Sequence, residues 1–257
     1  MPINYARRLT GKHRSLSANR QLGLTLCFVA GAINAGGFLA VHQYTSHMTG
    51  IVSSIADNLA LGTKDLGVAG LAALLSFIVG ASCSTVLIIY SRRRKMNSEY
   101  ALPLLLEAVL LLIFGPMGAR IDMTGGVFVS LTVMLLAFIM GLQNAVITKL
   151  SSAEIRTTHV TGIVTDIGIE LGKLLSARVA PSAPSVTGVP GVARLRLLAA
   201  LVGCFFAGGV IGALGFRWIG YFATVPLSLL LIVLAGVPVL DDVLLYVRGR
   251  LHHDRSE

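Results

Sequence analysis

Six stretches of this sequence are apolar for 19 to 25 residues each, and they constrain the fold more than any other feature. About 20 helical residues cross the hydrocarbon core of a bilayer, so each stretch is long enough for one crossing. Only one of the six contains a formal charge, at Glu107. The pattern predicts an all-α polytopic membrane protein. The stretches are residues 22–41, 66–90, 101–119, 125–147, 197–216 and 219–240.

The composition also indicates a membrane protein, because 54% of the residues are hydrophobic, 13% are charged and the mean hydropathy is +0.79. The net charge of +9 comes from cations that lie mainly between the apolar stretches. This placement is typical of cations that set membrane topology and contact anionic lipids. The expected partner is therefore a lipid bilayer, and nucleic acid is not expected. Cys27, Cys83 and Cys204 lie within apolar stretches and are expected to be buried small hydrophobic residues, not disulfides.

One short polar motif occurs twice. Residues 46–52 read Ser-His-Met-Thr-Gly-Ile-Val, and residues 158–164 read Thr-His-Val-Thr-Gly-Ile-Val, 112 positions later. An Asn-Ala pair precedes each copy, at Asn34 and at Asn144, 110 positions apart. Similarity at a fixed spacing predicts a duplicated unit. In a membrane protein, a repeated polar motif of this kind also predicts a solute site.

The segments that follow the motifs, residues 49–61 and 161–175, are too short or too polar for an ordinary crossing. Such segments are often re-entrant. With six crossings, two re-entrant or broken half-helices and a cytoplasmic N-terminus, 18 Lys and Arg residues fall inside and 3 outside. With eight crossings the division is 14 against 7. The positive-inside rule therefore favours six transmembrane helices.

Three crossings per unit would invert the second unit relative to the first, as in many transporters. We expect repeat one at about residues 22–119 and repeat two at about 125–240, with the two motifs meeting near the membrane centre. Residues 1–21 and 241–257 are expected to be cytoplasmic tails. The Pro-containing stretch 180–192 is expected to be a cytoplasmic loop.

The motif residues suit a small polar or anionic solute. Ser46 or Thr49, and Thr158 or Thr161, are candidate N-caps, and a helix N-terminus attracts anions. The histidines add donors that titrate near neutral pH, and the glycines permit close backbone approach. Structural roles in loops and helix packing remain open for each side chain taken alone. The predicted solute-binding residues are Asn34, His47, Thr49, Gly50, Gln143, Asn144, His159, Thr161 and Gly162.

Four acidic residues within or beside apolar stretches are candidate proton carriers, because an ionisable group at membrane depth suggests a function. They are Asp57, Glu107, Asp166 and Glu170. For Asp57, Asp166 and Glu170 a solvated helix face is an equal alternative. No cofactor and no metal is expected.

Small residues four positions apart predict two close helix contacts. Gly80 and Ser84 lie in one apolar stretch, and Gly208 and Gly212 in another. Such small-xxx-small faces let helix backbones approach in membranes. Glycines that are merely tolerated are the alternative for any single pair.

Four ordered motifs resemble the YoaK-like family of bacterial integral membrane proteins, a domain of unknown function. The motifs are Gly31-Ala-Ile-Asn-Ala-Gly-Gly-Phe38, His47-Met-Thr-Gly50, Gly141-Leu-Gln-Asn-Ala145 and Thr158-His-Val-Thr-Gly162. The chain has Asn34 and Ile51 where the family tends to have Asp and Asn. The resemblance covers nearly the whole chain. It implies a location in the bacterial inner membrane and gives no substrate.

The leading hypothesis is a transporter or channel for a small polar solute, with an anion favoured over a cation. A membrane enzyme that uses a metal or acid–base groups is one alternative, although no compact ligand motif or nucleophile setting is present. A sensor or assembly protein without transport is the other. The sequence leaves the oligomeric state open, a homo-oligomer included.

Overall fold

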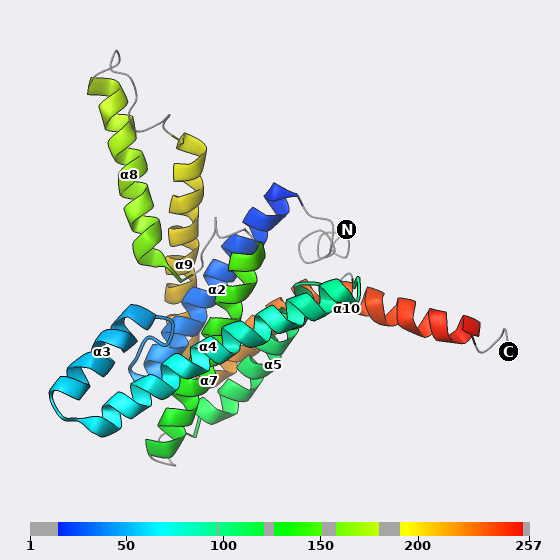
Figure 1. The fold of residues 1–257 in the computed structure, drawn as a ribbon, viewed down its shortest axis with the longest axis horizontal. Helices are drawn as coiled ribbons and strands as arrows, with labels where there is room; N and C mark the ends of the chain where they lie inside the picture. Colours follow the sequence, from blue (N-terminus) through cyan, green and yellow to red (C-terminus); the bar gives the residue numbers. More distant parts are fainter. Residues whose placement is uncertain (1–14, 97, 121–125, 151–157, 180–190, 254–257) are drawn as a thin grey trace.

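The computed structural model describes residues 15–96, 98–120, 126–150, 158–179 and 191–253, and their regular structure is helical (Figure 1). The all-α prediction is confirmed. The helices, in chain order, are α2 (Leu16–Val41), α3 (Met48–Ala60), α4 (Lys64–Arg93), α5 (Ala101–Gly118), α7 (Gly126–Leu150), α8 (Val160–Val179), α9 (Val192–Ile219), the 3-10 turn η1 (Gly220–Ala223) and α10 (Thr224–His253).

Five helical stretches are long and apolar enough to cross a membrane. Four of them lie in α2, α4, α5 and α7, and the fifth, Val192–Leu244, contains α9 and most of α10. The short helices α3 and α8 are not among them. The Pro-containing loop expected at residues 180–192 falls mostly outside the described residues.

Several helices extend beyond their apolar stretches. α2 begins at Leu16 rather than at residue 22, and α10 continues to His253 rather than ending at residue 240. Part of each expected tail is therefore helical. The physical reason is that hydropathy marks only the apolar part of a helix. Residues such as Leu, Val and Arg continue its backbone hydrogen bonds past that boundary.

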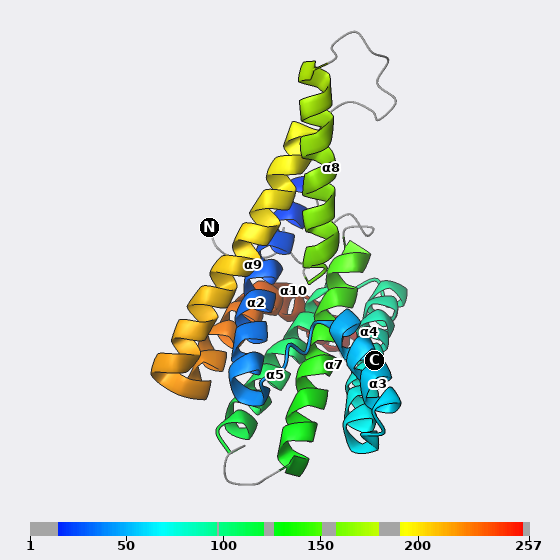
Figure 2. The ribbon, with the colours of Figure 1, turned by 90° about the vertical axis from the view of Figure 1, so that its left-hand side faces the viewer.

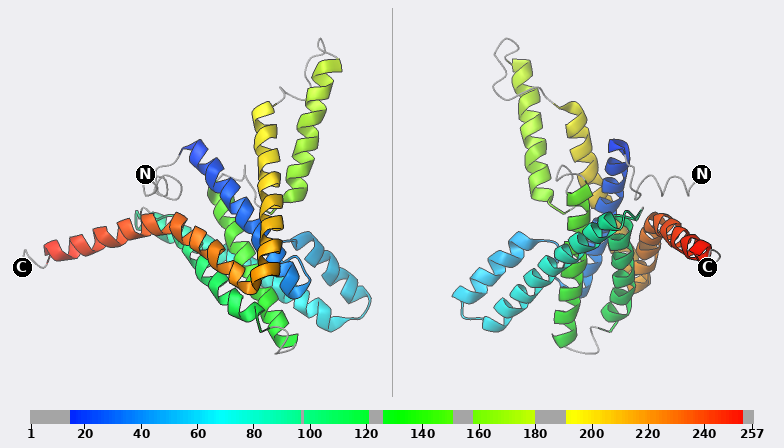
Figure 3. Two further views of the ribbon diagram at one scale, coloured as in Figure 1. Left: turned by 180° about the vertical axis from the view of Figure 1, so that it is seen from behind. Right: turned by 45° about the vertical axis from the view of Figure 1, so that its right-hand side comes forward.

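The long helices form a bundle from which two hairpins project. α2 packs most extensively on α9, α4 on α7, and α5 on α10. Figure 2 shows α8 and the outer part of α9 extending beyond the bundle. In Figure 3 the α3–α4 hairpin leaves the bundle in a different direction, and the end of α10 runs away from both.

The outer surface of the bundle carries large apolar side chains. Val86 on α4 is 65% exposed, and Phe206 on α9 is 71% exposed. A water-soluble protein rarely exposes contiguous apolar surface of this kind. The surface and the apolar helices together imply a lipid bilayer environment.

The α2–α9 contact depends on glycines that let the two backbones touch. A Cβ atom on Gly31 would overlap the carbonyl oxygen of Phe205, and one on Gly208 would overlap the carbonyl oxygen of Phe28. A Cβ atom on Gly212 would also overlap the backbone of α2, at Ala32. The predicted close contact at Gly208 and Gly212 is confirmed.

The α4–α7 contact is built in the same way. A Cβ atom on Gly80 would overlap the carbonyl oxygen of Phe138, and one on Gly141 would overlap that of Phe77. Ser84, one turn after Gly80, is fully buried. The predicted close contact is therefore confirmed at Gly80, and Ser84 is buried. These two glycine contacts fix the positions of the four helices that surround the motifs.

Candidate functional site

The two copies of the repeated motif open onto one pocket of about 400 Å³. The first copy contributes Ser46 and His47, and the second contributes Thr158, Val160 and Thr161. Asn34 on α2, Tyr44 in the following loop and Phe205 on α9 complete the described lining. Segments 112 residues apart in the chain thus share one polar site.

Each motif is tied to the preceding long helix by the same hydrogen bond. The Ser46 hydroxyl donates to Oδ1 of Asn34 at 2.9 Å, and the Thr158 hydroxyl donates to Oδ1 of Asn144 at 2.7 Å. The amide of Asn144 also donates to the carbonyl oxygen of Met140 at 2.7 Å. The two asparagines therefore set the positions at which the short helices begin.

These bonds change the expected capping of α3. The N-cap of α3 is His47, without a side-chain capping bond, so the prediction of Ser46 or Thr49 is wrong. The Ser46 hydroxyl is already engaged with Asn34, and Thr49 stands within the first turn of the helix. The first N–H groups of a helix have no partner within it, and here that end of α3 adjoins the pocket.

The first turns of the two short helices match. The Ile51 N–H donates to the His47 carbonyl at 3.1 Å, and the Ile163 N–H donates to the His159 carbonyl at 3.1 Å. Both isoleucines are buried. Each helix therefore has a histidine immediately before it and an apolar anchor in its first turn.

The glycines of the two motifs differ in their surroundings. A Cβ atom on Gly50 would overlap the imidazole ring of His47, so this glycine leaves room for the ring. A Cβ atom on Gly162 would have no neighbour within 4 Å. An added methyl group would therefore displace a neighbouring side chain in the first motif alone.

The predicted solute residues are only partly brought together. Asn34, His47 and Thr161 line the pocket, and Gly50 and Asn144 position lining residues. Gln143 is fully buried and ties α7 to α2 by donating to the Leu26 carbonyl at 3.4 Å. The other three predicted residues are exposed and lie outside the described lining. They are Thr49, His159 and Gly162.

The lining also includes residues that the sequence prediction did not select. Ser46 and Thr158 open the two motif copies, so the repeat itself was a signal for them. Tyr44 and Phe205 carried no such signal, because they reach the pocket only through the packing of the loop and of α9.

Two of the candidate proton carriers, Glu107 and Asp57, differ in burial. Glu107 on α5 has no exposed surface, and neither of its carboxylate oxygens has a hydrogen-bond partner among the described residues. Asp57 on α3 has an exposed side chain. Neither residue lines the pocket.

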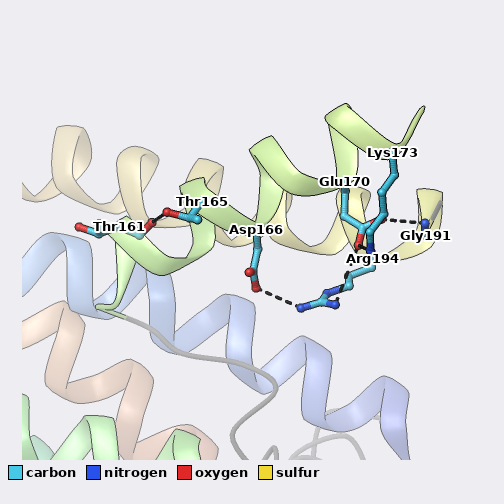
Figure 4. Close-up of polar contacts among 7 residues, drawn as sticks. All are labelled: Thr161, Thr165, Asp166, Glu170, Lys173, Gly191 and Arg194. Atoms are coloured by element: carbon cyan, nitrogen blue, oxygen red, sulfur yellow. Dashed lines mark hydrogen bonds and ion pairs between the residues drawn. The ribbon is translucent and has the colours of Figure 1, made fainter. Parts of the chain in front are cut away.

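The other two, Asp166 and Glu170, join α8 to α9 away from the pocket (Figure 4). Asp166 pairs with Arg194 at 3.1 Å. Glu170 pairs with Lys173 at 3.0 Å and accepts a hydrogen bond from the Gly191 N–H at 2.8 Å. This backbone bond, and then the bond from Lys173, lower the pKa of Glu170.

Comparison with known proteins agrees with the assignment to a membrane protein. A family profile described as "Protein of unknown function (DUF1275)" matches residues 22–237. The chain is similar to the "UPF0700 transmembrane protein YoaK" of Bacillus subtilis (strain 168), with 30% identity over 146 residues. That match covers 55% of this chain and 62% of the relative, less than two thirds of its length. No solved structure matches the chain.

Proposed function

The chain belongs to the DUF1275 family of multi-pass membrane proteins of unknown function, and we propose that it is a transporter or channel for a small polar anion. The observation that carries the proposal is the shared pocket, because both copies of the motif line it. Its volume of about 400 Å³ falls in the ordinary range of small-molecule sites, about 300–1,000 Å³.

Matched contacts support two equivalent units, as the proposed inverted repeat with six crossings requires. Gly31 and Gly141 are 110 positions apart, Gly80 and Gly208 are 128 apart, and each contacts a phenylalanine carbonyl on the opposite unit. In this arrangement α2 of the first unit packs on α9 of the second, and α7 packs on α4. Two units that pack on each other in this reciprocal way, with the binding site between them, are typical of transporters.

The chemistry of the lining favours an anion. The hydroxyl group of Thr161 and the ring of His47 supply donors, and the described lining contains no Asp or Glu. The N-terminal ends of α3 and α8 both adjoin the pocket. Each contributes the positive end of a helix dipole and N–H groups that have no acceptor within the helix itself.

We assign the proton-coupling role to Glu107 among the four acidic candidates. It is fully buried without a partner in the described part of the chain, whereas Asp166 and Glu170 are paired with cations. We place the protein in the bacterial inner membrane with both termini in the cytoplasm, because this orientation puts most Lys and Arg residues inside.

Flux measurements in proteoliposomes test the proposal. The probes are the sodium salts of nitrate, formate and bicarbonate, each measured with wild-type protein and with empty liposomes. The variant His47→Ala/Thr161→Ala removes two lining side chains and should abolish most of the protein-dependent flux. Thr165→Ala is the matched control, because Thr165 lies one turn along α8 and outside the described lining.

Two results would contradict the proposal. Equal flux in the double variant and in the Thr165→Ala control would remove the site assignment. Failure of all three anions to exceed empty liposomes would remove the anion class. Each variant is first checked for insertion and for a single peak in size-exclusion chromatography.

A further inference from the structure

The far ends of α3 and α8 are fastened by equivalent junctions with different chemistry. On α3, the amide of Asn58 donates to the Ser54 carbonyl at 2.7 Å. The hydroxyl of Thr63, the N-cap of α4, donates to Oδ1 of Asn58 at 2.7 Å. This junction between a short helix and the next long helix uses neutral groups alone.

The corresponding positions on α8 are charged. Glu170 and Asp166 stand 112 positions after Asn58 and Ser54, and Gly191, the N-cap of α9, stands 128 positions after Thr63. Glu170 bonds the Gly191 N–H where Asn58 bonds Thr63. The second unit thus replaces a neutral junction with an ionic one.

Arg194 is the cation that crosses between the helices. It contacts Asp166 at 3.1 Å and lies 3.9 Å from Glu170, both on α8. Lys173 is on α8 itself, so its pair with Glu170 joins two residues of one helix. The cluster of Asp166, Glu170, Lys173 and Arg194 therefore holds α8 against α9 mainly through Arg194 and the Gly191 N–H.

Contact with the next long helix attaches α8 less extensively than it attaches α3. α8 is seven residues longer than α3, yet it packs less extensively on α9 than α3 does on α4. Leu175 near its far end is 62% exposed, and Ile163 near the pocket is buried. One end of α8 is anchored by the core and the other by charge.

We propose that this cluster is a charge-dependent latch that regulates the pocket by fixing the position of α8. Thr161 lines the pocket and Glu170 follows nine residues later, about 14 Å along a helix. Release of the far end lets α8 tilt away from α9 about its buried first turn, and this tilt changes the position and accessibility of Thr161 in the site. The α3 side keeps its neutral junction. The regulatory role of the latch rests on the proposed function of the pocket.

The ion pair between Arg194 and Asp166 is partly exposed to solvent, which makes the latch sensitive to salt. The side chain of Arg194 is 59% exposed and that of Asp166 is 41% exposed, so dissolved ions screen their attraction. The groups that face Glu170 are Lys173 on its own helix and Arg194 and the Gly191 N–H on α9. All of them favour its ionised form.

Thiol labelling at position 161 tests the latch without any solute. Thr161→Cys is placed in a background in which Cys27, Cys83 and Cys204 are replaced by Ala. A membrane-impermeant maleimide is applied to either face of sealed proteoliposomes at neutral pH. Arg194→Gln should raise the labelling rate several-fold, and so should high salt in the parent protein. Lys173→Gln, which removes the same charge but no contact between helices, should leave the rate unchanged.

Arg194→Lys should return the rate toward that of the parent, because it keeps the charge. Equal labelling of Arg194→Gln and Lys173→Gln overturns the latch, whether both rise or neither does. If Arg194→Gln fails to insert, Asp166→Asn takes its place with the same expectation. Altered labelling in protein that moves no anion would keep the latch and reject transport, so the two proposals fail separately.

Discussion

The Thr158 hydroxyl donates a hydrogen bond to Oδ1 of Asn144 at 2.7 Å and holds the start of α8 to the end of α7. Asn34 and Ser46 make the matching bond at the start of α3. A side chain that fixes a turn in this way restricts the helix that follows. The pocket therefore depends on two asparagines in the C-terminal parts of long helices, one of which, Asn144, does not line it.

Replacing each asparagine with alanine should lower the free energy of unfolding to a different extent, because the two side chains differ in burial. Asn144 is 6% exposed and makes two side-chain bonds, whereas Asn34 is half-buried and makes one in the described chain. Asn144→Ala should lower the free energy of unfolding by about 1–3 kcal/mol, and Asn34→Ala by about 1 kcal/mol or less. Thermal unfolding in detergent measures both. A larger loss for Asn34→Ala would contradict this account.

The two motif glycines make a second matched pair. Gly50→Ala should displace the His47 ring and reduce anion flux at least several-fold, because the added methyl group overlaps the imidazole. Gly162→Ala meets no neighbour and should keep flux near wild type while stabilising α8 by about 0.5–1 kcal/mol. Flux and unfolding are measured on the same preparations. Equal flux in the two variants would show that the ring position is unimportant.

The main helix contact gives a third prediction. Gly208→Ala should destabilise the protein by about 1–3 kcal/mol, because the methyl group overlaps the Phe28 carbonyl. Gly203→Ala lies on the same helix with no neighbour within 4 Å, so it is the matched control and should be neutral or stabilising. The readout is the unfolding midpoint in detergent. Similar midpoints in both variants would mean that α2 and α9 are farther apart than the structure has them.

The pKa of Glu170 gives a prediction about pH. Because the folded state lowers this pKa, the stabilisation from Glu170 is present above its ordinary value of 4.5 and is lost as pH falls through the lowered value. The difference in unfolding midpoint between wild type and Glu170→Gln should therefore be constant from about pH 7 to pH 5 and shrink only in stronger acid. A difference that shrinks between pH 7 and pH 6 would indicate a raised pKa.

Apolar length and repetition predict much of this fold. Each of the six long apolar stretches overlaps one of the long helices of the described chain, and the segments predicted at 49–61 and 161–175 correspond to α3 and α8 within four residues at either end. These features are visible in sequence because they depend on local composition. The repeat also pointed to the pocket, since His47 and Thr161 both line it.

Contacts between distant residues account for what the sequence did not predict. His47 is the N-cap residue of α3 because the Ser46 side chain is hydrogen-bonded to Asn34, twelve positions earlier. Asp166 is paired because Arg194 lies on the next helix, 28 positions later. Neither partner can be chosen from spacing alone, because each pair forms only when two helices pack together.

The buried carboxyl group of Glu107 gives the last prediction. An ionisable side chain with no hydrogen-bond partner in the described chain costs stability, and an apolar residue of similar size removes that cost. Glu107→Leu should therefore raise the free energy of unfolding by about 1–3 kcal/mol. If Glu107 carries the proton, the same variant should also lose the dependence of anion uptake on a pH gradient.

Glu107→Gln separates the two effects, because it keeps the shape and polarity but binds no proton. Gradient-dependent uptake should disappear in both variants, while only Glu107→Leu should gain stability. Uptake in an imposed pH gradient and thermal unfolding provide the two readouts. A stabilised Glu107→Leu protein with unchanged gradient-driven uptake would leave this carboxyl group without a role in coupling, because its removal would have changed packing and nothing else.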